Sequence, residues 1–116
     1  MNNKLVDSIV AGIQEKKGRN ITIVDLTSIT DVICEYFVIC QANSSNQIGA
    51  VVDSIKVKAR ELADERPSHV QGLATDWAAM DYGHVMVHIL LPEAHDYYKL
   101  ESLWADATLT EIKNLD

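Results

Sequence analysis

The feature that most constrains this chain is a segment dense in aromatic, histidine and carboxylate residues between positions 77 and 104. It predicts two strands over 75–81 and 84–91, a hairpin turn at Gly83, and a helix that begins at Pro92. Polar and titratable side chains are costly to bury without partners. We therefore expect a substrate, a metal ion, another protein or the core itself to contact them.

The remaining segments predict elements that can share one sheet. Apolar residues at helical spacing indicate helices over 4–17 and from Ser44, where Gln47 completes a capping box, toward Pro67. Strands are expected over 20–26 and 35–41, the second apolar enough to be buried on both faces. A short extended piece is expected around His69 and Val70. This order predicts an α/β fold with a single mixed β-sheet and helices packed on it.

The length of 116 residues suits one domain, which we place at residues 1–107. Residues 108–116 are expected to form a C-terminal tail, weakly helical or frayed. The helix after Pro92 is expected to bury one side, formed by Leu100, Leu103, Trp104 and Ala107.

Charge and cysteine content narrow the classes of partner. The formal net charge of −7 argues against broad binding to a phosphate backbone and permits a basic protein partner. Cys34 and Cys40 form no CxxC pair, and Cys40 is expected in the core. The N-terminus lacks the features of a secretory signal, and no apolar run approaches the roughly 18 residues of a membrane span. We therefore expect a cytoplasmic protein that does not enter a membrane.

Metal binding and catalysis are the chemical alternatives for this segment. His84 and His88 lie too far apart on one strand to share an ion, and no HExxH motif is present. No GxSxG elbow or phosphate-cradling glycine loop is present either. We expect no cofactor and no enzyme. The alternative that stays open is a small metal- or nucleotide-dependent enzyme using Asp81, His88 and His95.

The aromatic residues favour a protein-binding surface instead, because a few such anchors carry most of the binding energy of an interface. Tyr97 and Trp104 are expected in the core, whereas Trp77 and Tyr98 suit core or surface equally. A third possibility is a homodimer that buries Trp77 and Tyr98.

Two runs carry a resemblance to the ribosomal silencing factor family, also called Iojap or RsfS. They are Trp77-x-x-x-Asp81-Tyr82-Gly83-x-Val85-x-Val87-His88 and Glu93-x-x-x-x-Tyr98-x-Leu100-Glu101-x-Leu103-Trp104. Asp25-Leu26, the strand Tyr36-Phe37-Val38-Ile39 and Asn43-Ser44-Ser45 fit the same family, so that the resemblance covers nearly the whole chain.

The resemblance implies a nucleotidyltransferase-like fold without that catalytic function, in keeping with the lack of any Asp-x-Asp in the sequence. It also implies docking on the large ribosomal subunit, at its intersubunit face, against the ribosomal protein numbered fourteen. There the factor would block joining of the small subunit, with no sequence-specific contact to nucleic acid. In organelles such proteins assist subunit assembly.

By the same resemblance, the partner-binding residues are Trp77, Asp81, His88, Tyr98, Leu100 and Glu101. Trp77 and Tyr98 would supply apolar contact. Asp81 and Glu101 would pair with Arg or Lys of the partner or orient the motif internally. For Leu100, a place in the core is the stronger interpretation.

The chain departs from the family pattern at three positions. It has His95 where the family usually has Arg, Gln71 before Gly72 where Glu is common, and His84 where Asp is common. A histidine lacks the guanidinium fork and its permanent charge. Any ion pair made by His95 is therefore expected to depend on pH.

Overall fold

The computed structural model of this protein describes residues 3–29, 34–103 and 107–115. Three α-helices and one short 3-10 helix lie in these ranges: α1 (Lys4–Glu15), α2 (Ser45–Ala63), α3 (Pro92–Tyr98) and η1 (Leu100–Leu103). The same ranges contain six strands: β1 (Arg19–Asp25), β2 (Tyr36–Gln41), β3 (His69–Gln71), β4 (Trp77–Asp81), β5 (Val85–Leu90) and β6 (Thr108–Ile112).

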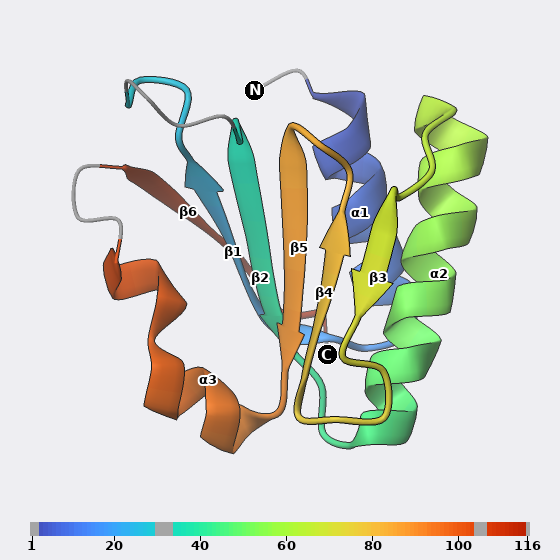
Figure 1. The fold of residues 1–116 in the computed structure, drawn as a ribbon, viewed down its shortest axis with the longest axis vertical. Coiled ribbons are helices and arrows are strands. Elements are labelled where there is room, and N and C mark those ends of the chain that lie inside the picture. Colours follow the sequence, from blue (N-terminus) through green and yellow to red (C-terminus); the bar gives the residue numbers. More distant parts are fainter. Residues whose placement is uncertain (1–2, 30–33, 104–106, 116) are drawn as a thin grey trace.

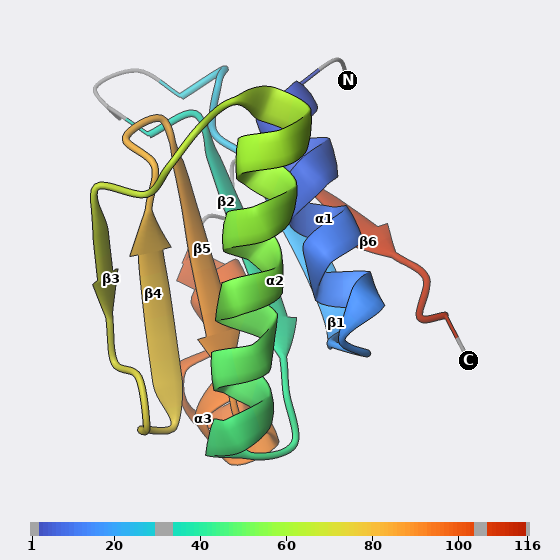
Figure 2. The same cartoon turned by 90° about the vertical axis from the view of Figure 1, so that its right-hand side faces the viewer.

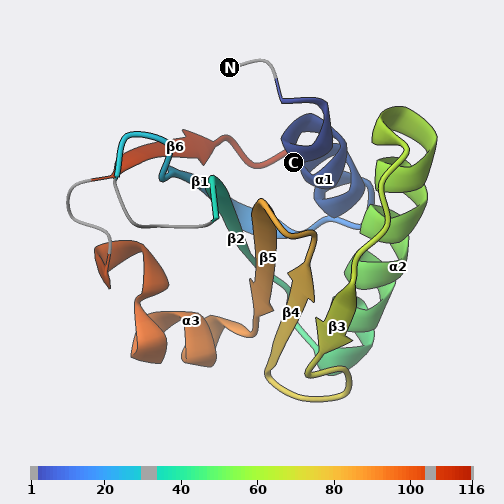
Figure 3. The ribbon, with the colours of Figure 1, turned by 45° about the horizontal axis from the view of Figure 1, so that its top comes forward.

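The six strands form one sheet in the order β3-β4-β5-β2-β1-β6 (Figure 1). β2 and β5 run parallel, and the other neighbouring strands run antiparallel. Helices α1 and α2 cover one face, while α3 lies on the other side beside the end of β5 (Figures 2 and 3). The prediction of an α/β fold with a single mixed sheet is confirmed. β2 carries the buried run Val38, Ile39 and Cys40, as expected for a central strand.

The larger core lies between the sheet and α1 and α2, and these helices approach most closely at Gly12. A Cβ atom at Gly12 would lie 2.8 Å from the Cα of Ile55. The Ser54 hydroxyl donates to the Gly12 carbonyl over 2.9 Å. The missing side chain therefore allows the two helix backbones to touch. This core includes Leu5, Val6, Ile9, Ile13, Val38, Cys40, Ile48, Val51, Val52, Ile55, Val85, Val87 and Ile89.

A smaller core lies on the opposite face, where α3 packs. Its buried members are Val24, Leu26, Ile39, Leu90 and Ala94. Partly buried apolar side chains, among them those of Phe37, Trp77 and Leu100, pack against it. Because α3 is short, this cover extends over only part of the face.

Local signals in the sequence correctly predicted the start of α2, the start of α3 and the turn between β4 and β5. The Ser44 hydroxyl accepts from the Gln47 backbone N–H over 3.1 Å, which makes Ser44 the cap of α2. Pro92 opens α3, and Gly83 turns the β4–β5 hairpin with a φ of 88°. The expected extended piece around His69 is β3.

The prediction of a weakly helical or frayed tail over 108–116 is wrong for its first part. Thr108–Ile112 form β6, which pairs antiparallel with β1 from Asp25↔Thr108 to Ile21↔Ile112. The β-branched residues Thr108, Thr110 and Ile112 favour an extended chain, and the open edge of β1 supplies backbone partners. Spacing within the tail does not reveal that edge, because it belongs to a strand more than 80 residues earlier.

The helix that begins at Pro92 is also shorter than predicted. α3 ends at Tyr98 because Lys99 takes a left-handed conformation with a φ of 47°, and η1 follows. Leu103 is consequently 66% exposed, against the expectation that it is buried, and Leu100 and Ala107 are only half-buried. Trp104 lies outside the described residues.

In the described part of the chain, every helix is too short or too polar to cross a membrane.

Candidate functional site

Four rings from three elements form a continuous row on the face that carries α3, and we call it the aromatic patch: Trp77, His88, Tyr97 and Tyr98. Trp77 begins β4, and His88 lies on the neighbouring strand β5. The ring centroids of Trp77 and Tyr98 are 4.7 Å apart, those of Trp77 and His88 5.8 Å, and those of Tyr97 and Tyr98 5.0 Å. The fold therefore brings strand and helix residues far apart in sequence into one apolar unit.

The base of the patch is half-buried and holds a hydrogen bond. The Trp77 indole N–H donates to Nδ1 of His88 over 3.1 Å. Burial lowers the pKa of His88 to about 4, so the imidazole is neutral near pH 7. A neutral, hydrogen-bonded imidazole beneath the rings supports an apolar contact surface.

The top of the patch faces solvent. Tyr97 is 80% exposed and Tyr98 is 44% exposed, so the expectation that Tyr97 belongs to the core is wrong. α3 has only seven residues, and its one buried residue is Ala94, so the helix has no second buried turn that would take in Tyr97. Exposed carboxylates of Asp76, Glu93 and Asp96 lie on the same segments.

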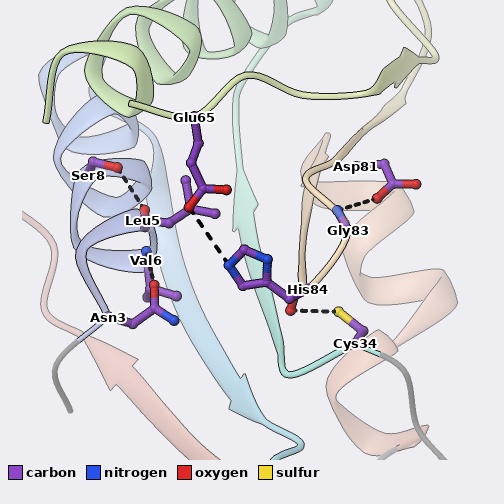
Figure 4. Close-up of polar contacts among 9 residues, drawn as sticks. All are labelled: Asn3, Leu5, Val6, Ser8, Cys34, Glu65, Asp81, Gly83 and His84. Carbon is purple, nitrogen blue, oxygen red and sulfur yellow. Dashed lines mark hydrogen bonds and ion pairs between the residues drawn. The ribbon is translucent and has the colours of Figure 1, made fainter. Parts of the chain in front are cut away.

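Asp81 lies at the far end of β4 from Trp77. Its Oδ1 accepts from the Gly83 backbone N–H over 2.7 Å, an Asx-type contact that shapes the hairpin (Figure 4). Asp81 also lines a small hollow of about 190 Å³. The hollow is bordered by His69, Gln71, Ala79, Asp81 and Met86. The structure therefore places Asp81 and Gln71 at this hollow, apart from the aromatic patch.

Leu100 and Glu101 lie on η1 and have inward contacts. Leu100 is half-buried and packs against the smaller core. The Glu101 carboxylate lies 2.5 Å from Nε2 of His95, while Nδ1 of His95 lies 2.5 Å from Oε1 of Gln41. The side chains of His95 and Glu101 are only 12% and 23% exposed. Of the two roles expected for Glu101, the structure displays an internal one.

A polar groove of about 720 Å³ runs between α3 with η1 and the strands β1 and β6. His95 and Glu101 form part of its wall, together with Gln41 at the end of β2. The groove is thus on the other side of α3 from the tryptophan contact. Its lining mixes amide, carboxylate and ammonium groups.

The residues of the alternative enzyme hypothesis are not assembled into one site. Asp81 binds the hairpin backbone, His88 belongs to the aromatic patch, and His95 bridges Gln41 and Glu101. His84 lies 3.9 Å from Glu65, near the Cys34 thiol that contacts the His84 carbonyl (Figure 4). Across residues 3–29, 34–103 and 107–115, no group of three or more His, Cys, Asp or Glu side chains is placed to hold a metal ion.

Sequence reasoning missed two residues that shape this region, Phe37 and Gln41. The Phe37 ring contacts His88 edge-on, with the ring centroids 5.4 Å apart. The side-chain amide of Gln41 contacts Nδ1 of His95. Alternation along β2 puts both on the same face as Ile39, which was a usable signal. The second signal was Gln41 itself, a polar residue at the end of an otherwise apolar strand.

Comparisons with known proteins agree over most of the chain. The family model described as "Ribosomal silencing factor during starvation" matches residues 1–116. The chain is 32% identical to the ribosomal silencing factor RsfS of Bacillus subtilis, over 97% of this chain and 95% of that protein. It is 28% identical to the Mus musculus protein named mitochondrial assembly of ribosomal large subunit protein 1, over 85% of this chain and 44% of that protein.

A crystal structure of a protein from Chromobacterium violaceum is similar in fold. The TM-score is 0.79 at 28% sequence identity, and the match covers 86% of this chain and 82% of that one. Sequence and structure comparisons therefore both find relatives that match most of this chain.

Proposed function

Because this chain belongs to the ribosomal silencing factor (RsfS) family, we propose that it represses translation in the cytoplasm by occupying the large ribosomal subunit. It docks at the intersubunit face, against the ribosomal protein numbered fourteen, and blocks joining of the small subunit. The names of its relatives support this reading, since one is a silencing factor and another is named for assembly of the large subunit.

The observation that carries the proposal is the exposed aromatic patch. Tyr97 and Tyr98 present apolar rings with polar tips to solvent, Trp77 packs against Tyr98, and His88 holds Trp77 through a hydrogen bond. Anchors of this kind, rigid and already placed, lose little conformational entropy on binding. The patch therefore supplies the centre of the interface, with Leu100 supporting it from the smaller core.

Charge selects the kind of partner. The formal net charge is −7, and Asp76, Glu93 and Asp96 are exposed on the segments that carry the patch. A basic ribosomal protein attracts such a surface, whereas the surrounding RNA repels it. Asp81 at the hairpin end extends the acidic side of the docking surface.

Repression then follows from steric exclusion. A domain with principal extents of 36 × 33 × 28 Å bound at the intersubunit face occupies space that the small subunit needs. Neither turnover nor a cofactor enters the mechanism. The sheet with α1 and α2 on one face fits our further proposal of a nucleotidyltransferase-like fold, used here without catalysis.

A homodimer through the aromatic patch is the competing arrangement. It predicts that self-association and subunit binding exclude one another. Sedimentation velocity over a concentration series, with and without large subunits, separates the two.

The direct test measures binding to separated ribosomal subunits by co-sedimentation and subunit joining by light scattering. Tyr98→Ala is expected to weaken binding to the large subunit by about tenfold or more, as for an interface anchor, and to relieve the block on joining. Val57→Ala is the matched control, because Val57 is 42% exposed on α2, on the other face of the sheet.

Circular dichroism and thermal unfolding establish that both variants are folded. Equal binding by Tyr98→Ala and wild type would show that the aromatic patch is not part of the interface. Binding by wild type to the small subunit alone, or to neither subunit, would refute the proposed function.

A further inference from the structure

His95 connects three elements through one side chain. It lies on α3, its Nδ1 is 2.5 Å from Oε1 of Gln41 at the end of β2, and its Nε2 is 2.5 Å from the Glu101 carboxylate on η1. The side chain is only 12% exposed. A single imidazole thus links the helix that carries Tyr98, the 3-10 helix that carries Leu100, and the sheet.

The two partners of His95 are both oxygen acceptors. An imidazolium donates from both ring nitrogens, whereas a neutral imidazole donates from one only. Protonated His95 therefore satisfies both contacts, and its bond to Glu101 is a charge-assisted ion pair. Loss of the proton removes the charge from that bond, and the Gln41 contact then requires the amide to turn so that its NH₂ group donates.

We propose that His95 is a positioning residue that, in its protonated form, clasps α3 and η1 to β2 and holds the aromatic patch in its docking geometry. The inference deepens the proposed ribosomal docking and rests on it for its effect on affinity. It makes docking proton-dependent: tighter when His95 carries its second proton than when the imidazole is neutral.

Charged side chains from several elements lie around His95. Three carboxylates and two ammonium groups line the groove with it, and β1 and β2 contribute uncharged side chains there. The charged residues are Asp96 on α3, Lys99 at its C-terminal cap, Glu101 on η1, and Glu111 and Lys113 at β6. Glu101 is the carboxylate that contacts His95, and the other two carboxylates and the two ammonium groups balance in charge.

The first measurement uses the free protein. Amide hydrogen exchange over residues 95–103 is followed at pH 6 and pH 8, corrected for intrinsic rates. Protection in wild type is expected to fall by about fivefold at pH 8, as expected for the weakening of one hydrogen bond. His95→Arg keeps a permanent charge, so its protection is expected to stay constant, and Glu101→Gln is expected to show low protection at both pH values.

The second measurement determines the affinity for the large subunit at the same two pH values. Affinity of wild type is expected to fall about fivefold from pH 6 to pH 8, in step with the exchange data, while that of His95→Arg stays flat. His84→Gln is the matched control, because His84 lies at the opposite end of β5 and should leave the wild-type profile unchanged.

The outcomes separate this inference from the proposed function. The same pH dependence in wild type and His95→Arg would overturn the clasp. Protection that responds to pH as expected, with no subunit binding at either pH, would keep the clasp and refute the docking. If His95→Arg does not fold, Glu101→Gln decides alone: wild-type protection at pH 6 in that variant would overturn the clasp.

Discussion

The indole N–H of Trp77 donates to Nδ1 of His88 over 3.1 Å, and this bond fixes the tautomer of the histidine. An indole nitrogen is only a donor, so Nδ1 must be the acceptor and the proton of neutral His88 is on Nε2. A proton added at Nδ1 would break the bond and place a charge beneath the aromatic patch. Burial opposes that charge and lowers the pKa of His88 to about 4.

Stability is therefore expected to fall as the solution becomes more acidic. His88 in the unfolded chain takes up its proton near the ordinary pKa of about 6.5, whereas in the folded protein it does so near 4. Between these pH values the unfolded state binds more protons than the folded state. Neutral His88 therefore contributes fully to the free energy of unfolding above about pH 6.5, and this contribution is lost as the pH falls to 4. The loss is at most about 3 kcal/mol. Urea unfolding at pH 7, 5.5 and 4.5 measures it.

His88→Gln keeps an acceptor for the indole and removes the titration. This variant is expected to lose most of the slope in this pH range, whereas His69→Gln, at an exposed position on β3, is expected to keep it. If His88→Gln and wild type show the same slope, the hydrogen bond to Trp77 is not linked to protonation.

Gly72 is expected to be essential for the position of Trp77. Its φ is 81°, and a Cβ atom there would collide with the Trp77 carbonyl oxygen. Gly83 has a similar φ of 88°, but its Cβ would meet no described heavy atom within 4 Å. Gly83→Ala should therefore cost about 1 kcal/mol from backbone strain alone, and Gly72→Ala clearly more. Urea unfolding compares the two, and equal costs would show that the space beside Trp77 is not limiting.

The parts of the fold that sequence could predict were those coded locally. The cap at Ser44, the turn at Gly83 and the apolar run of β2 are short-range signals, and each is found in the structure. β6 was missed because its formation depends on the open edge of β1, which no local pattern describes. Pairing between segments this far apart can be predicted only once the arrangement of the other strands is known.

The candidate site shows the same division. The resemblance carried by residues 77–104 predicted the family, and the family match confirms it. Trp77 contacts Tyr98, and Gln41 contacts His95, because α3 runs back across the sheet. The sequence pattern alone does not describe that path. The residue type of Tyr97 suits a core position, but α3 buries only Ala94, and Tyr97 is exposed.

Two helical glycines give opposite predictions for the same substitution. Gly12→Ala is expected to destabilise the protein by about 2 kcal/mol or more, since its Cβ would lie 2.8 Å from the Cα of Ile55 and would push α1 from α2. Gly49→Ala is expected to stabilise it by up to about 1 kcal/mol, because helix propensity improves. A Cβ at Gly49 would meet none of the described atoms within 4 Å. Thermal unfolding of both variants tests this, and a neutral Gly12→Ala would mean that the helices can separate at low cost.

Gln47 connects the end of α1 to the start of α2, so its loss should cost more than loss of the cap beside it. Its Oε1 accepts from the Asn43 backbone N–H over 2.6 Å, and its Nε2 donates to the carbonyls of Lys16 and Lys17 over 3.1 and 3.3 Å. Ser44→Ala removes one capping bond and is expected to cost about 1 kcal/mol.

Gln47→Ala removes three bonds and is expected to cost about 2 kcal/mol, with Gln47→Glu between the two because it keeps the acceptor but cannot donate. Urea unfolding ranks the three variants. A cost for Gln47→Ala no larger than for Ser44→Ala would mean that the contacts to the Lys16 and Lys17 carbonyls add nothing to stability, and that the contacts around Gly12, Ser54 and Ile55 are enough to join the two helices.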